Sequence, residues 1–98
     1  MKTINVTELK KMISDKEDFS LIDVREENEF EADNIDGVLI PLGEIPSRMN
    51  EIPKNKKVIV HCRSGVRSAN AIQFLEQNGY DNLHNLEGGI IAWNQAYN

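Results

Sequence analysis

Short runs of β-branched and other apolar residues alternate along this 98-residue chain with segments of helical periodicity. The clearest run, Lys57–Val60, is continuous and typical of a strand buried on both faces. A helix is predicted next over Ser68–Asn78, with Gly79 as its C-cap. Because parallel strands need crossover connections, strands alternating with helices predict a mainly parallel sheet covered on both faces. The expected fold class is therefore α/β, with three layers.

The remaining elements follow from the same patterns. Further strands are expected at Ile4–Val6, Ser20–Val24, Val38–Ile40 and Leu83–Leu86, which makes five strands. Further helices are expected after a capping Thr7, over Glu26–Ala32, over Glu44–Ile52 and from Gly88-Gly89 through Trp93. No repeat or flexible linker interrupts the order, so residues 1–98 are interpreted as a single domain.

Composition excludes several classes of function. The chain has 11 Lys and Arg against 16 Asp and Glu, a net charge of −5, which argues against binding nucleic acid or a membrane surface. A single Cys excludes an internal disulfide framework and a multi-thiolate zinc site, and no metal or cofactor is expected. No apolar run could span a bilayer and the first residues lack a secretory signal, so a cytoplasmic protein is expected.

The single cysteine, Cys62, lies where the predicted buried strand turns into a helix. Ligands of open α/β sheets bind at this position, and the helix start offers free backbone N–H groups. Gly65 allows the loop to turn several N–H groups inward as an anion-binding nest, and Arg63 and Arg67 add positive charge. These effects favour the thiolate, so the pKa of Cys62 is predicted to lie below its free value of about 8.5.

Spacing narrows the chemistry of this loop. A lone Cys after a β-branched run is often an inert core residue, but the residues that follow are poor core neighbours and good anion ligands. His61-Cys62 matches the start of the tyrosine-phosphatase signature, which has five residues between Cys and Arg. Only four residues separate Cys62 from Arg67 here, so the loop should form a tighter cradle, better matched to one added sulfur atom than to a phosphate.

Four segments together resemble single-domain rhodaneses, which are sulfurtransferases. The segments are DVREENEF (23–30), NIDGVLIPLGEI (34–45), CRSGVRS (62–68) and LEGGIIAW (86–93). The resemblance implies a five-stranded parallel sheet with helices on both sides, in which the second and fourth strands are neighbours. It would place Asp23 and Arg25, at the end of the second strand, beside the Cys62 loop.

The resemblance also implies a mechanism. The Cys62 thiolate would take a sulfur atom from a small anionic donor such as thiosulfate, or from a protein persulfide, and pass it to cyanide or another thiol. Site residues would be Cys62 as nucleophile and its loop, with Asp23 and Arg25 in support. The loop residues are Arg63, Ser64, Gly65, Val66, Arg67 and Ser68.

Alternatives remain open at the level of sequence. A cysteine phosphatase or arsenate reductase would also use His61-Cys62 and an anion cradle, and a non-catalytic rhodanese-like interaction module is a third possibility. Asp23 could hold the loop or simply pair with Arg25. His61 should point away from the side chain of Cys62, because successive strand residues face opposite sides. The four glutamates between residues 26 and 31 are expected to form a solvated helix face.

Overall fold

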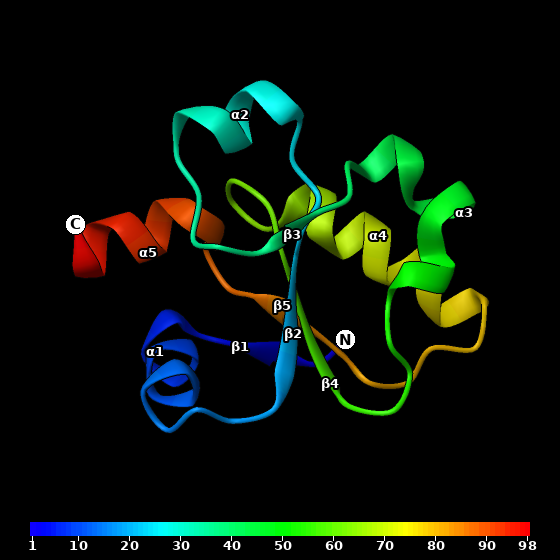
Figure 1. The fold of residues 1–98 in the computed structure, drawn as a ribbon, viewed down its shortest axis with the longest axis horizontal. Helices are drawn as coiled ribbons and strands as arrows, with labels where there is room; N and C mark the ends of the chain where they lie inside the picture. The colour runs from blue at the N-terminus through cyan, green and yellow to red at the C-terminus, as the bar shows by residue number, and fades with distance from the viewer.

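A computed structural model describes residues 1–98 and shows a five-stranded sheet in the order β1-β5-β4-β2-β3, with every pair parallel. Helices cover both faces of this sheet (Figure 1), so the predicted three-layer α/β fold is confirmed. The strands are β1 (Thr3–Ile4), β2 (Phe19–Asp23), β3 (Val38–Leu39), β4 (Lys57–His61) and β5 (Leu83–Leu86).

Strand β4 lies at the centre of the sheet, as its β-branched sequence predicts. Val58, Ile59 and Val60 are all buried. Val58 and Val60 belong to the larger apolar cluster, whereas Ile59 belongs to a second cluster on the other side. Successive strand side chains point to opposite faces, so one strand contributes to both cores. Cys62, just beyond β4, belongs to the larger cluster and thus lies on the same face as Val60.

The helices are divided between the two faces and one edge. Helices α1 (Val6–Ser14) and α5 (Gly89–Tyr97) cover one face, and α3 (Ile45–Arg48) and α4 (Val66–Gln77) cover the other (Figure 1). The short helix α2 (Glu27–Ala32) lies beyond the carboxyl ends of β2 and β4. In parallel α/β sheets this edge is where ligands bind.

The prediction that Thr7 caps the first helix is wrong. Asn5 is the N-cap: its side chain accepts a hydrogen bond from the Glu8 amide at 2.8 Å, and the Glu8 side chain accepts one from the Asn5 amide at 3.0 Å. This reciprocal capping box starts the helix at Val6 and shortens the preceding strand to Thr3–Ile4.

The single helix expected over Glu44–Ile52 is also wrong. The segment has a 3-10 turn at Leu42–Glu44, one turn of α-helix in α3, and a second 3-10 turn at Met49–Glu51. The backbone of Arg48 leaves helical geometry with φ −122° and ψ 9°, which interrupts the i→i+4 hydrogen bonds. Ile45 and Ile52 still face the core, so the apolar spacing was informative about burial but not about helix type.

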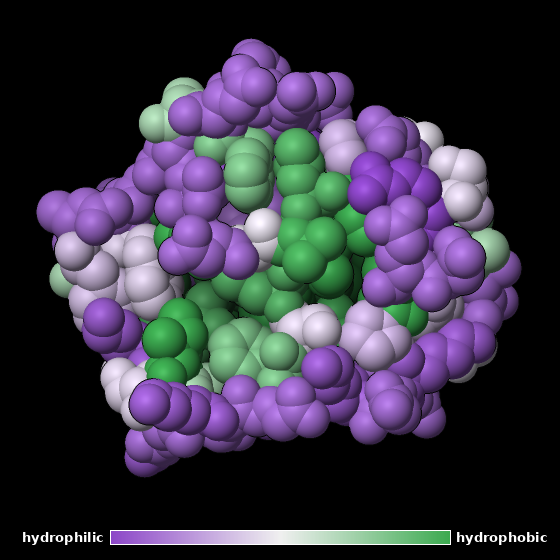
Figure 2. Space-filling view, viewed as in Figure 1, coloured by the Kyte–Doolittle hydropathy of each residue, from purple (hydrophilic) through white to green (hydrophobic).

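One apolar area remains uncovered beside the edge strand β3. Figure 2 shows apolar side chains in the middle of the face that carries β2 and β3. A shallow hollow there is lined by seven residues, of which Ser20 and Asp36 are polar and five are apolar: Ile13, Phe19, Leu21, Ile35 and Val38. This hollow contains no residue of the Cys62 loop. None of the helices combines the length and the apolar composition needed to cross a bilayer.

Candidate active site

Three groups of the loop after β4 surround the sulfur of Cys62. The amide N–H of Gly65 donates to Sγ at 3.1 Å, the amide of Ser68 donates at 3.4 Å, and the Ser68 hydroxyl lies 3.3 Å away. Cys62 is only 1% exposed. Its sulfur is therefore recessed, with apolar core on one side and hydrogen-bond donors on the other.

Gly65 gives the loop its inward curvature. Its φ of 115° lies in the left-handed region, where a residue with a Cβ is strained, and it forms the N-cap of α4. Helix α4 begins directly after it at Val66, two residues earlier than predicted. The first turn of α4 consequently contributes the Ser68 amide, one of the free N–H groups of a helix start, to the sulfur.

The start of α5 orients the other side of the loop. The Ile90 amide donates to the carbonyl of Cys62 at 3.0 Å, and the Ile91 amide donates to the carbonyl of Arg63 at 3.1 Å. In a trans peptide the C=O and the following N–H point in opposite directions. With the Arg63 carbonyl drawn towards α5, the Ser64 N–H is turned towards the sulfur, with which it interacts.

Gly89 is required for this close approach. A Cβ on Gly89 would lie 2.4 Å from the Arg63 carbonyl oxygen and 2.5 Å from that of Cys62. Its φ is also positive, at 57°, as is that of Gly88 at 76°. The Gly88-Gly89 pair therefore serves two purposes: it makes the turn from β5 into α5, and it brings the helix start against the Cys62 loop.

The hydrogen bonds lower the pKa of the Cys62 thiol despite its burial. Burial has the largest individual effect and raises the pKa, because it disfavours the charged thiolate. The Ser68 hydroxyl and the amides of Ser68, Gly65 and Ser64 lower it, and together they outweigh burial. The pKa of Cys62 is thus lowered, as the sequence predicts.

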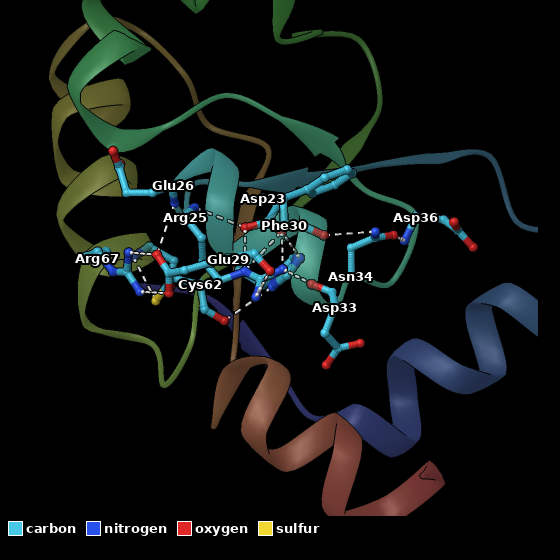
Figure 3. Close-up of polar contacts among 12 residues, drawn as sticks. Asp23, Arg25, Glu26, Glu29, Phe30, Asp33, Asn34, Asp36, Cys62 and Arg67 are labelled. Atoms are coloured by element: carbon cyan, nitrogen blue, oxygen red, sulfur yellow. Dashed lines mark hydrogen bonds and ion pairs between the residues drawn. The ribbon is translucent and has the colours of Figure 1, made fainter.

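Arg67 does not point freely into the anion cradle, because it forms a bidentate ion pair with Glu29 of α2 (Figure 3). Its two terminal nitrogens donate to the Glu29 carboxylate at 2.7 and 2.9 Å. The hydrogen bonds from Arg67 lower the pKa of Glu29 to about 2. Glu29 is thus an exception to the predicted solvated glutamate face, whereas Glu26, Glu27 and Glu31 are exposed.

The rim of the loop is formed by residues that face solvent. Arg63, Ser64 and Val66 are all exposed. Of the two loop arginines, only Arg63 has no ion pair. Arg63 is therefore the exposed loop arginine whose guanidinium has no carboxylate partner.

Asp23 and Arg25 make no hydrogen bond to the Cys62 loop. Asp23 follows Ile22 of the larger core cluster, so its side chain points to the opposite face of the sheet from Cys62. There it pairs with Arg25, whose terminal nitrogen lies 2.8 Å from Oδ2 of Asp23. The amide and Nε of Arg25 also donate to the Asp23 carboxylate, and its terminal nitrogens donate to the carbonyls of Glu29 and Asp33. This ion pair therefore holds the end of α2 (Figure 3).

His61 lies on the same face as Asp23, as strand alternation predicts. Its Nδ1 is 3.2 Å from the Cys62 carbonyl oxygen, and its Nε2 is 3.6 Å from Asp23 without a hydrogen bond. Burial is the main effect that lowers the pKa of His61, which keeps the imidazole neutral at neutral pH. No cluster of three or more His, Cys, Asp or Glu side chains could hold a metal ion.

One buried residue of the site was missed in the sequence. Asn85 of β5 accepts a hydrogen bond from the Ser68 hydroxyl at 2.6 Å and donates one to the Gly65 carbonyl at 3.1 Å. Its position carries a signal, because it shares a face with the buried Leu83, and a buried amide needs partners. The identity of those partners depends on β5 lying next to β4.

Comparisons with known proteins agree with this architecture. The family model described as "Rhodanese-like domain" matches residues 5–96. A sulfurtransferase of Allochromatium vinosum is 44% identical over 91 residues, which cover 92% of this chain and 85% of that protein.

Solved structures give the same result. A rhodanese-related protein from Thermoplasma volcanium has a TM-score of 0.88 at 33% identity, over 99% of this chain and 94% of that one. A rhodanese-like domain protein from Staphylococcus aureus has a TM-score of 0.88 at 38% identity, over 95% of this chain and 91% of that one. With its sheet order, its cysteine loop and these relatives taken together, the chain belongs to the rhodanese-like domain family.

Proposed function

We propose that this protein transfers a sulfane sulfur atom from a donor to a thiophilic acceptor through a persulfide on Cys62. The observation that carries the proposal is the set of loop hydrogen bonds to the Cys62 sulfur. Sulfur transfer in general agrees with the sulfurtransferase relative from Allochromatium vinosum. The persulfide and the identities of donor and acceptor are proposals.

In the first step the Cys62 thiolate attacks the outer sulfur of the donor. With thiosulfate, a bond forms between Sγ and that sulfur, the donor S–S bond breaks, and sulfite leaves with the electron pair. The new terminal sulfur, about 2 Å beyond Sγ, carries the negative charge. We expect N–H groups of the loop to stabilise that charge, as the amides of Gly65 and Ser68 do for Sγ itself.

In the second step an acceptor removes the outer sulfur. A cyanide ion or a thiolate attacks it, the new bond forms, and the Cys62–sulfur bond breaks. Cys62 leaves with the electron pair as a thiolate. The same donors that lower its pKa make it a good leaving group.

The ion pair of Arg67 favours sulfur transfer over phosphoryl transfer. A phosphatase of this type needs a guanidinium free to bind the phosphoryl oxygens. Here the Arg67 guanidinium is bidentate to Glu29, at 2.7 and 2.9 Å. The four-residue spacing between Cys62 and Arg67 also gives a smaller cradle.

The charges around the loop bear on the donor. Arg63 is exposed and unpaired, and is suited to attract a small anion or an anionic segment of a persulfide-carrying protein. Classical thiosulfate rhodaneses carry a second basic residue where this chain has Ser64, so the donor is proposed as either thiosulfate or a persulfide. We propose the cytoplasm as its location, since a reducing compartment keeps a lone thiol available.

Mass spectrometry tests the proposal directly. After incubation with thiosulfate or a polysulfide, the intact protein should gain one sulfur atom, and cyanide should then release thiocyanate. Because Cys62 is the only cysteine, Cys62→Ser should lose both signals. An unmodified wild-type protein that yields no thiocyanate contradicts the proposal. Turnover of an aryl phosphate that is lost in Cys62→Ser would support the phosphatase alternative instead.

A further inference from the structure

Asn85 connects two groups that contact the Cys62 sulfur. Its Oδ1 accepts from the Ser68 hydroxyl at 2.6 Å, and its Nδ2 donates to the Gly65 carbonyl at 3.1 Å. Ser68 and Gly65 are the residues whose groups lie within 3.4 Å of Sγ. Asn85 itself is buried and makes no hydrogen bond to the sulfur.

The Ser68 hydroxyl has one proton and two neighbours that can accept it. One is Oδ1 of Asn85 at 2.6 Å, and the other is Sγ of Cys62 at 3.3 Å. In the thiol form all three groups are satisfied, because the Cys62 S–H donates to Ser68 and Ser68 donates to Asn85. In the thiolate form the sulfur is also an acceptor for the Ser68 hydroxyl. If Ser68 donates to the sulfur, Oδ1 of Asn85 loses its hydrogen bond from that hydroxyl.

The persulfide resembles the thiol in this respect. Once a second sulfur is attached, the negative charge lies on the outer atom, and the inner sulfur has no need of the hydroxyl proton. The Ser68 hydroxyl can then keep its short hydrogen bond to Oδ1 of Asn85. The bare thiolate is the one form of the site in which Asn85 and Cys62 compete.

We propose that Asn85 is a positioning residue that holds the Ser68 hydroxyl proton and thereby favours the thiol and persulfide forms of Cys62 over the bare thiolate. The persulfide part rests on the proposed function, whereas the part concerning thiol and thiolate does not. Asn85 acts through Ser68 and touches no reacting atom.

Other charged groups near the site are not altered by a neutral substitution at position 85. The charges on the Cys62 side are Arg63 and Arg67 of the loop and the carboxylates of Glu26 and Glu29, at and in the start of α2. Asp23, Arg25 and His61 lie on the opposite face of the sheet. A change in Cys62 caused by Asn85→Leu therefore reports on hydrogen bonding and loop geometry rather than on net charge.

A double-mutant cycle distinguishes an effect of Asn85 through the Ser68 hydroxyl from a merely structural role. The pKa of Cys62 is measured from the pH dependence of its alkylation by iodoacetamide in wild type, Asn85→Leu, Ser68→Ala and the double variant. Asn85→Leu should lower the pKa by about one unit, because the hydroxyl proton becomes available to the thiolate. Ser68→Ala should raise it, and in that background Asn85→Leu should have little effect.

Two outcomes would overturn the proposal. If Asn85→Leu shifted the pKa of Cys62 equally with Ser and with Ala at position 68, Asn85 would act through Gly65 or the loop as a whole. If the pKa of Cys62 were raised or unchanged in Asn85→Leu, Asn85 and Cys62 would not compete for the hydroxyl proton. Asn85→Asp, which keeps the shape and the acceptor, serves as a second variant. It should raise the pKa, and by less when Ser68 is Ala.

The persulfide part has its own measurement. Protein loaded with sulfur from a polysulfide should lose it to cyanide several times faster in Asn85→Leu than in wild type, because the departing thiolate is better stabilised. An unchanged or slower release contradicts the persulfide part. If the wild-type protein takes up no sulfur from the polysulfide, the proposed function fails. The alkylation experiment still tests whether Asn85 acts on Cys62 through Ser68.

Discussion

The chemistry of Cys62 is decided by atoms within one hydrogen bond of its sulfur. A buried thiol in apolar surroundings resists ionisation, and Cys62 is buried. The Ser68 hydroxyl and loop amides reverse that effect and lower its pKa. The same residue type in the same strand position without this loop would be an inert core side chain.

The ion pair between Arg67 and Glu29 gives a prediction at this scale. The folded-state pKa of Glu29, about 2, lies below the ordinary value of 4.5. A carboxylate with a lowered pKa stabilises the fold above its ordinary pKa, and this stabilisation is lost as the pH falls from 4.5 towards 2. Allowing for partial exposure, Glu29→Gln should cost about 1 kcal/mol at neutral pH.

Urea unfolding at several pH values checks this prediction. The difference between wild type and Glu29→Gln should narrow steadily below the ordinary pKa of a glutamate. Glu31→Gln, on the same helix but exposed and without an ion pair, is the matched control and should change little. A difference that stays constant down to strongly acidic pH would show that the ion pair does not stabilise the fold.

Among the elements, α5 shapes the Cys62 loop without contributing a side chain to the sulfur. Its first amides bind the carbonyls of Cys62 and Arg63, and that contact depends on a glycine at position 89. Helix α2 has a similar indirect role, because Arg25 and Arg67 attach it to the sheet end and to the loop. Elements distant in sequence thus determine which way the loop amides point.

Gly89→Ala tests the role of this contact. The added Cβ would overlap the carbonyl oxygens of Cys62 and Arg63, at a positive φ. The substitution should cost about 1–3 kcal/mol in unfolding free energy and slow the alkylation of Cys62 near neutral pH, because the loop amides are displaced. Gly43→Ala is the control, since no atom lies within 4 Å of its added Cβ. Equal losses in the two variants would contradict the role assigned to α5.

At the scale of the molecule, one sheet connects both cores and the site. Strand β4 supplies residues to both apolar clusters and ends just before Cys62. Strand β1, at the start of the chain, pairs with β5, near its end. Cores that share a central strand cannot unfold independently without breaking that strand's pairing. The chain is therefore expected to unfold as one cooperative unit.

Two probes can check this cooperativity. Trp93, the only tryptophan, packs against the smaller cluster and reports on that side by fluorescence. Far-ultraviolet circular dichroism reports on the helices of both faces. The two urea transitions should coincide. A tryptophan transition at clearly lower urea would mean that α1 and α5 detach separately.

Local patterns in the sequence were sufficient for the class of fold, and they predict a site at the Cys62 loop. The buried run of β4, the bounds of β5 and the paired glycines before α5 depend on neighbouring residues, and the structure has them as predicted. The predictions at Thr7 and over Glu44–Ile52 failed because side-chain capping and one non-helical backbone angle decide where short helices start and stop.

Tertiary structure alone decided which residues meet at the site. Glu29 lies 38 positions from Arg67, and Asn85 lies 17 positions from Ser68. By contrast, the strand alternation that turns Asp23 to the face opposite Cys62 is a local pattern of the sequence. Periodicity and turn residues are properties of a few consecutive positions, so the sequence shows them directly. Partners across the sheet depend on strand order and crossover, which emerge only when the whole chain packs.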